Sequence, residues 1–201
     1  MNKLKTAKVI KALREGGMGV MPTDTIYGLV GSALNKRTVY RLIRLRRRDL
    51  KKPFIILISS VGDLELFDIT PGRRTQALLK MWWPGKVSVI MPLKRDQGIR
   101  RAFAYLHRGT NRLAFRLPKP AWLRNLLSET GPLVAPSANL PDKPAVRTVR
   151  EAKKYFGNRV DFYWDAGKLE RKPSALVRID GRGVTVLRPG AAAGISVLKN
   201  H

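Results

Sequence analysis

Short apolar runs alternate with segments of helical periodicity along the whole chain, and this alternation restricts the fold more than any other feature. A short apolar run bounded by Gly, Pro or Ser is typical of a buried strand, whereas apolar positions that repeat every three or four residues are typical of a helix with one buried face. The expected strands are residues 18–21, 54–58, 86–91, 113–117, 133–135, 160–164, 175–179 and 184–187, and the expected helices are residues 4–13, 73–81, 122–127 and 149–156, with one more that Asn35 caps. The last two strands flank a Gly-rich turn, which predicts an antiparallel hairpin. The sequence therefore predicts an α/β fold in which a twisted, open sheet of parallel and antiparallel strands is flanked by helices.

The length of 201 residues and the hydrophobic content of 44% allow one sizeable core. We expect a single domain over residues 1–190 and a C-terminal tail over residues 191–201. Residues 61–66 are expected to form a short helical turn. Residues 94–112 have poor periodicity, so we expect a long basic loop there with at most one turn of helix.

The chain carries 40 Lys and Arg against 14 Asp and Glu, a formal net charge of +26. A potential of this sign attracts polyanions, so RNA, DNA or a nucleotide is the expected partner. A host whose proteins are basic throughout, or a requirement for solubility, would also explain the charge, and the composition leaves these interpretations open. In each case we expect non-specific nucleic-acid binding that weakens with salt.

The chain has no cysteine and only two histidines, His107 and His201. This argues against disulfides, thiolate nucleophiles, zinc sites of the sulfur type and histidine triads. We expect His107 at the surface, and catalysis by hydroxyls, carboxylates and Lys or Arg with a loosely held cation such as Mg²⁺. Residues 1–13 are charged at helical spacing and no window approaches the ~18 apolar residues of a membrane span, so we expect no signal peptide, no membrane partner and a cytoplasmic location.

Residues 21–31, Met-Pro-Thr-Asp-Thr-Ile-Tyr-Gly-Leu-Val-Gly, form the candidate binding loop. An apolar run ends there in two hydroxyls and a carboxylate. Pro22 cannot donate to a sheet ladder and belongs at a strand end, while Gly28 and Gly31 let the backbone bend or approach a ligand. Thr23, Asp24 and Thr25 also suit a turn that satisfies local amides. The residues alone favour neither interpretation.

Four motifs in this order resemble the YrdC/YciO family of threonylcarbamoyl-AMP synthases: Pro-Thr-Asp-Thr-Ile-Tyr-Gly-Leu at 22–29, Trp-Pro-Gly-Lys-Val-Ser at 83–88, Ala-Pro-Ser-Ala-Asn at 135–139, and Pro-Ser-Ala at 173–175 with Arg-Pro-Gly at 188–190. The resemblance covers about residues 5–191. It implies a YrdC-like domain with a concave basic face. It also implies a nucleotidyltransferase that converts L-threonine, bicarbonate and ATP, with Mg²⁺, into threonylcarbamoyl-AMP and pyrophosphate. The product would serve N6-threonylcarbamoyladenosine formation at position 37 of tRNA, with the tRNA threonylcarbamoyl-transferase machinery as a further partner.

The resemblance also assigns site residues. It places Arg46 and Arg48 in catalysis, and it assigns no metal ligand. The remaining assignments are Arg48, Lys52, Ser137, Asn139 and Arg188 to ATP, and Thr25, Arg116 and Ser174 to threonine. These residue types suit the chemistry, because planar guanidinium groups match carboxylates and phosphates and fixed cations meet the charge that develops at the α-phosphate.

Several positions depart from the family pattern. The family's lysine is Arg46, and the other departures are Asp49 for proline, Pro141-Asp142 for Ser-Gly, Ala175 for threonine, and Leu57 where some synthases carry histidine. These departures make the chain resemble the YciO branch more closely.

The alternative function is therefore that of a YciO-like protein with weak or altered nucleotide chemistry. Such a protein would bind double-stranded RNA or rRNA through basic residues in 94–124 and 147–154. Taken without the motifs, residues 46–48 also suit a solvated helix end, and Ser137 with Asn139 a capping pair.

Overall fold

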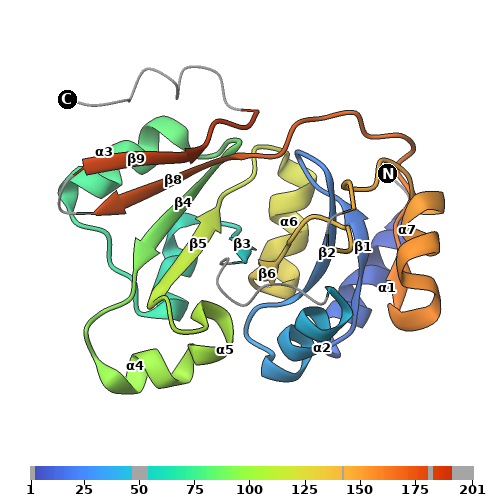
Figure 1. Ribbon diagram of the computed structural model, residues 1–201, viewed down its shortest axis with the longest axis horizontal. Coiled ribbons are helices and arrows are strands. Elements are labelled where there is room, and N and C mark those ends of the chain that lie inside the picture. Colours follow the sequence, from blue (N-terminus) through green and yellow to red (C-terminus); the bar gives the residue numbers. More distant parts are fainter. Residues whose placement is uncertain (1–2, 47–53, 142, 181–182, 192–201) are drawn as a thin grey trace.

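One sheet runs through the protein and joins residues from both ends of the chain (Figure 1). The structure, a computed structural model, describes residues 3–46, 54–141, 143–180 and 183–191. Within these ranges nine strands form the sheet in the order β7-β1-β2-β6-β3-β5-β4-β8-β9. The strands are β1 (Met18–Pro22), β2 (Tyr27–Ser32), β3 (Ile55–Leu57), β4 (Val87–Pro92), β5 (Arg112–Arg116), β6 (Leu133–Val134), β7 (Phe162–Tyr163), β8 (Ala175–Asp180) and β9 (Gly183–Arg188). Strands β1 and β2 therefore lie near one edge, and β8 and β9 form the other.

The sheet is mixed. Strands β1 and β7, β3 and β5, and β4 and β8 pair in parallel, whereas the other neighbours are antiparallel. Helices flank it: α1 (Lys3–Arg14), α2 (Lys36–Arg46), α3 (Arg73–Trp82), α4 (Gln97–Ala102), α5 (Ala104–His107), α6 (Ala121–Thr130) and α7 (Val149–Phe156), with 3-10 turns η1 (Val61–Phe67) and η2 (Gly157–Arg159). This confirms the predicted α/β fold. No helix of the described residues is long and apolar enough to cross a membrane.

One face of the sheet carries the main core. Helices α2, α3, α5 and α7 and the turn η1 place apolar side chains against it. Successive strand residues point to opposite faces, so Phe115 lies in this core and its neighbour Arg116 points away from it. The strand residues Val89 and Val177 lie in the same core, which leaves Ser88 and Leu176 on the face of Arg116.

The opposite face is covered over only part of its width. Helices α1 and α6 pack there on β1, β2, β3 and β6, with residues such as Leu13 and Leu127 against Val30 and Leu57. This second apolar cluster contains no residue of β4, β5, β8 or β9. None of the described helices therefore packs on this face in the half of the sheet that carries Arg116, and this arrangement makes room for the site.

Residues 27–32 form a strand that the sequence analysis does not predict. The stretch 21–31 is interpreted there as a strand end and a binding loop, but β2 pairs with β1 from Met18↔Gly31 to Pro22↔Tyr27. The turn between them contains only residues 23–26. Glycine lowers strand propensity, which conceals β2 in the sequence. A Cβ atom at Gly31 would lie 2.4 Å from Cγ2 of Thr38, so the glycine lets α2 pack closely on β2.

The basic segment 94–112 is not the predicted loop. It forms α4 and α5, and the Asp96 carboxylate accepts a hydrogen bond from the Ile99 amide at the start of α4 (2.8 Å). Both helices are short, and α5 ends at Arg108, which has a positive φ, so they leave little periodicity in the sequence.

His107 is buried, contrary to the predicted surface position. Its Nδ1 accepts from the amides of Gly109 (3.1 Å) and Asn111 (3.3 Å), which leaves Nε2 as the protonated nitrogen that donates to the Arg100 carbonyl (2.8 Å). The imidazole thus closes the turn after α5, a structural role that one isolated histidine in a sequence does not reveal.

Replacing His107 by alanine is expected to lower the free energy of unfolding by about 2 kcal/mol, because a buried side chain and its hydrogen bonds to three backbone groups are lost. Urea denaturation at neutral pH measures this change. The control is Arg101→Ala, which removes an exposed side chain from α4 and should stay within about 0.5 kcal/mol of the wild type. Equal unfolding midpoints for the two variants would contradict the structural role of His107.

Candidate functional site

A cavity of about 950 Å³ lies on the half of the sheet that α1 and α6 leave uncovered. Ile90, Arg116 and Leu176 on strands β4, β5 and β8 contribute to it. Its other walls come from the turn after β1, the segments 135–139, 144–147 and 169–174, and the end of β9 at Arg188. The cavity therefore combines residues from most of the sequence.

The turn between β1 and β2 is held by its own hydroxyl groups and also faces the cavity. Thr23 Oγ1 donates to the Ile26 carbonyl (2.7 Å), accepts from the Thr25 amide (3.2 Å) and lies 3.1 Å from Thr25 Oγ1. Both threonines are buried as residues, and both line the cavity. The two interpretations of this turn are thus compatible, since local bonds fix a loop that borders the cavity.

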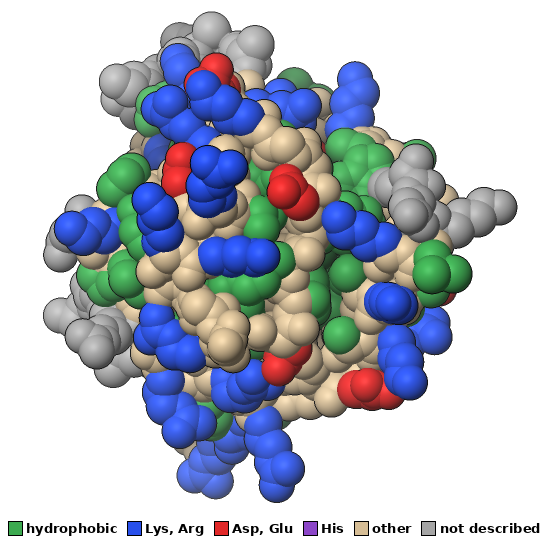
Figure 2. Space-filling view, turned by 90° about the vertical axis from the view of Figure 1, so that its right-hand side faces the viewer, with side chains coloured by type: hydrophobic (Ala, Val, Ile, Leu, Met, Phe, Trp, Pro, Cys, Tyr) green, Lys and Arg blue, Asp and Glu red, His purple; other side chains and the backbone are tan. Residues whose placement is uncertain are grey.

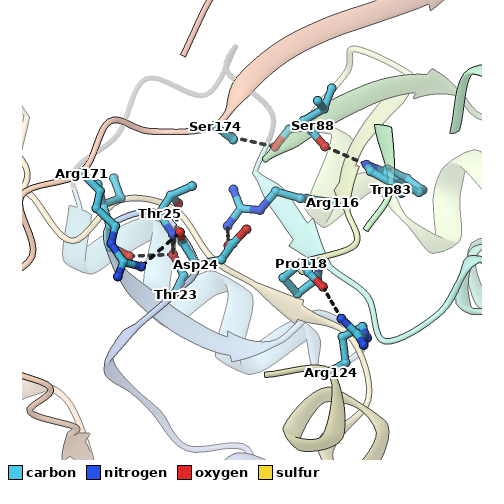
Figure 3. A network of polar contacts seen from close by, with 12 residues as sticks. Thr23, Asp24, Thr25, Trp83, Ser88, Arg116, Pro118, Arg124, Arg171 and Ser174 are labelled. Carbon is cyan, nitrogen blue, oxygen red and sulfur yellow. Dashed lines mark hydrogen bonds and ion pairs between the residues drawn. The ribbon is translucent and has the colours of Figure 1, made fainter. Parts of the chain in front are cut away.

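Asp24, in the same turn, forms a buried ion pair with Arg116 on β5 (Figure 3). Arg116 Nη2 lies 2.8 Å from Asp24 Oδ1, with side-chain exposures of 4% and 2%. Burial lowers the pKa of Arg116, and the negative charge of Asp24 opposes this shift. Within the described ranges, Asp24 Oδ2 and Arg116 Nε are buried without a hydrogen-bond partner. Arg116 therefore keeps unused donor capacity beside the cavity.

A second polar cluster joins β4, β8 and β9. The hydroxyls of Ser88 and Ser174 lie 2.9 Å apart, and Arg188 donates from Nε to the Ser174 carbonyl (3.1 Å). Burial lowers the pKa of Arg188, and the positive charge of Arg116 lowers it further. The positive charges of Arg116 and Arg188 thus repel each other at this end of the cavity. In the part of the chain that the structure describes, only Arg116 of the two has a carboxylate partner.

Arg46 at the end of α2 supports the loop after β6. Its Nη2 donates to Asn139 Oδ1 (2.8 Å) and its Nε to the Asn139 carbonyl (3.2 Å), while Ser137 Oγ donates to the same Oδ1 (2.6 Å). Ser137 also forms an isolated bridge with Gly28. The guanidinium of Arg46 is buried behind Ser137 and Asn139, which themselves line the cavity.

Most of the residues that the sequence singles out come together. The cavity is lined by Thr25, Arg116, Ser137, Asn139, Ser174 and Arg188, and Arg46 contacts two of them. Arg48 and Lys52 lie outside the described residues. The assignment of each residue to a substrate or to catalysis stays a prediction.

The sequence analysis gives no role to three further residues at the site. Asp24 stands in the noted loop and Ser88 ends the Trp-Pro-Gly motif, so the motifs contain a signal for both. Arg171, whose Nη1 lies 3.5 Å from the Asp24 carbonyl, lies in no motif and could be found only from the structure.

The cavity has the chemistry of an anion site. Its described lining contains Arg116, Arg147, Arg171, Lys172 and Arg188 and one acidic side chain, Glu170. Hydroxyl and amide groups lie beside these cations. No group of three or more His, Asp or Glu within the described ranges is arranged to hold a metal ion.

Proteins of known name are similar to this chain. It is 30% identical over 167 residues to a threonylcarbamoyl-AMP synthase of Bacillus subtilis, covering 83% of this chain and 47% of that protein. It is 28% identical over 155 residues to a threonylcarbamoyl-AMP synthase of Coxiella burnetii, covering 76% of this chain and 80% of that protein.

Solved structures and a family match agree with this similarity. Sua5 of Pyrococcus abyssi complexed with L-threonine superposes with a TM-score of 0.82 at 26% identity, over 94% of this chain and 55% of that one. YciO of E. coli shares the fold, with a TM-score of 0.82 at 22% identity over 95% of this chain and 91% of that one. The chain thus spans about half the length of the Bacillus and Pyrococcus proteins. The family described as telomere recombination, with the members Sua5, YciO and YrdC, matches residues 11–190, and the chain therefore belongs to the Sua5/YciO/YrdC family.

Proposed function

We propose that this protein is a threonylcarbamoyl-AMP synthase, which converts L-threonine, bicarbonate and ATP into threonylcarbamoyl-AMP and pyrophosphate for tRNA modification. One observation carries the proposal. Two guanidinium groups, Arg116 and Arg188, lie beside a cavity lined with hydroxyls, and among the described residues only Arg116 has a carboxylate partner, Asp24. This surplus of positive charge, of which Arg116 is buried and Arg188 partly buried, is stabilised by an anionic ligand. The names of the homologues and the threonine complex of Sua5 support the same ligand class.

The amino acid is assigned to the end of the cavity at Arg116. The threonine carboxylate would take the donors of Arg116 that Asp24 does not use, while Thr25 and Ser174 offer hydroxyls nearby. A charge-assisted contact to a buried guanidinium is strong and fixes the orientation of the carboxylate. This assignment explains why a single turn carries both the hydroxyls and Asp24.

The nucleotide is assigned to Ser137, Asn139 and Arg188, together with Arg48 and Lys52 outside the described residues. The cavity volume of about 950 Å³ is near the upper end for small-molecule sites, which extends to about 1,000 Å³. Two substrates can therefore lie side by side. Mg²⁺ fits a position where the phosphates supply most of its ligands, because Glu170 is the one carboxylate among the described lining residues. When bound, it would neutralise part of the phosphate charge.

The proposed reaction needs mainly positioning from the protein. The threonine nitrogen attacks the bicarbonate carbon with loss of water, and a carbamate oxygen then attacks the α-phosphorus while the bond to pyrophosphate breaks. Fixed cations such as Arg188 meet the negative charge that develops on the phosphates, and the held substrates react as if at high local concentration. Arg46 acts in this scheme on Ser137 and Asn139, which it holds in place. The product would pass to the transferase machinery that modifies tRNA.

Binding of double-stranded RNA or rRNA is the second candidate function. Figure 2 shows the side of the molecule on which α7 and α1 lie in Figure 1, with Lys and Arg side chains spread over it and few acidic ones between them. The exposed face of α7 carries Arg150, Lys153 and Lys154. None of these three residues lines the cavity, and exposed charges of this kind suit contacts with a phosphate backbone.

Replacing Arg116 by lysine is expected to raise KM for threonine about 10-fold to 100-fold, because one point charge replaces a planar donor set worth about 1.5 to 3 kcal/mol. Pyrophosphate release is measured against threonine at saturating ATP, with bicarbonate omitted as a blank. Arg178→Lys is the control, since Arg178 belongs to β8 and is absent from the cavity lining. An unchanged KM in Arg116→Lys would remove Arg116 from the threonine site.

RNA affinity should fall by orders of magnitude between ~50 and ~200 mM salt, because binding a polyanion releases counterions. Reversing Arg150 and Lys154 to glutamate should weaken binding of a tRNA-sized duplex and leave ATP binding unchanged. Filter binding for RNA and calorimetry for ATP check the two parts. The control Lys8→Glu with Lys11→Glu makes the same charge change on α1, and equal losses in both double variants would show that α7 has no special part.

A further inference from the structure

The hydroxyl of Tyr27 holds a segment that borders the cavity. Tyr27 is fully buried at the start of β2, and its hydroxyl donates to the Gly167 carbonyl (2.7 Å) and accepts from the Ala166 amide (3.0 Å). Burial raises the pKa of Tyr27, so the phenol keeps its proton at neutral pH. The hydroxyl thus uses its donor and acceptor capacity on the backbone of another part of the chain.

The segment it holds, residues 165–174, is called the strap. It connects β7, in the half of the sheet with β1, to β8 in the other half, and it contains no helix or strand (Figure 1). Its second part, residues 169–174, lines the cavity and includes Arg171 and Ser174. The strap therefore decides where two groups of the proposed site lie.

Few backbone bonds hold the strap between its ends. The ends are fixed by the Trp164 amide on the Val20 carbonyl (2.8 Å) and the Ala175 amide on the Lys86 carbonyl (2.9 Å). Between these ends, the Leu169 amide donates to the Arg147 carbonyl (2.8 Å), and the Pro173 carbonyl accepts from the Ala191 amide (2.8 Å). Residues 165–168 are exposed, and within the described residues their hydrogen bonds to the core are those with the Tyr27 hydroxyl, which also lies 3.5 Å from Asp165 Oδ1.

We propose that Tyr27 is a positioning residue whose hydroxyl holds the strap over the cavity and thereby raises the affinity for the bound substrates. The same strand start also ends the 23–26 turn, so β2 fixes the turn and the strap together. The identity of the substrates in this inference rests on the proposed function. The contact between Tyr27 and the strap does not.

Tyr27→Phe tests the inference, because it removes one oxygen and keeps a ring that packs in the main core. Loss of a hydrogen bond of about 0.5 to 1.5 kcal/mol should increase the open population of the strap about 2-fold to 13-fold. Trypsin reports this opening at Lys168 and Arg171, which are exposed. The initial rate of strap cleavage, followed by mass spectrometry, should rise by that factor. KM for threonine should rise similarly with kcat nearly unchanged.

Tyr163→Phe is the matched control. Its hydroxyl also donates to a glycine carbonyl, that of Gly157 (2.7 Å), but Gly157 lies outside the strap. Strap cleavage in this variant should equal that of the wild type, and the unfolding midpoint of both variants is measured by urea denaturation. If strap cleavage in Tyr27→Phe equals that in Tyr163→Phe, the inference is wrong. Faster cleavage with an unchanged KM also overturns it.

A different result would overturn the proposed function. Wild-type protein that releases no pyrophosphate in the presence of threonine and bicarbonate overturns that function, while the cleavage rates are unaffected by the absence of activity. In that case, ATP binding measured by calorimetry replaces KM. Weaker ATP binding in Tyr27→Phe than in Tyr163→Phe supports the role of the strap, and equal binding overturns it.

Discussion

The buried ion pair between Asp24 and Arg116 is the interaction on which the site depends. Removing two charges from water is costly, and their attraction offsets the cost only if the geometry is held. The pair joins the turn after β1, next to the helix-covered half of the sheet, to β5 at the border of the open half. Losing one partner would leave the other as an unpaired buried charge, at a cost of about 3 to 5 kcal/mol. The stability of the fold and the electrostatics of the cavity are therefore set by the same two side chains.

Most of the fold could be predicted because the apolar pattern follows the layers. Val20, Ile56 and Phe115 lie in runs that read as strands, and Leu13 and Leu127 lie in stretches that read as helices. The sequence does not predict strand β2, because glycine has a low strand propensity. Gly31 is needed there for another reason, since it lets α2 pack closely on the sheet. The helices α4 and α5 were missed because they are too short for a periodic signal. In both places tertiary contacts determine the local structure.

The site could be predicted as a set of residues but not as a set of contacts. Ordered motifs indicated which residues belong together, yet the hydroxyls of Ser88 and Ser174 meet only because β4 and β8 pair in parallel, with Val87 opposite Ala175. The contacts of Arg46 could not be predicted from the sequence either. A lysine could not reach the side-chain oxygen and the carbonyl of Asn139 with a planar donor pair, so this departure from the family pattern gives the loop a support that the sequence does not reveal.

The wide separation of the cavity residues in the sequence has a thermodynamic consequence. A ligand that touches Thr25 and Arg188 connects the turn between β1 and β2 to the end of β9. These two places come together only when the strands between them have paired into the sheet. Such a ligand binds the folded chain and has no equivalent site on the unfolded one, so it acts as a reversible crosslink. At a concentration 100-fold above its Kd it would stabilise the whole domain by about 2.7 kcal/mol. The occupancy of this cavity and the free energy of unfolding of the protein are therefore two measures of one equilibrium.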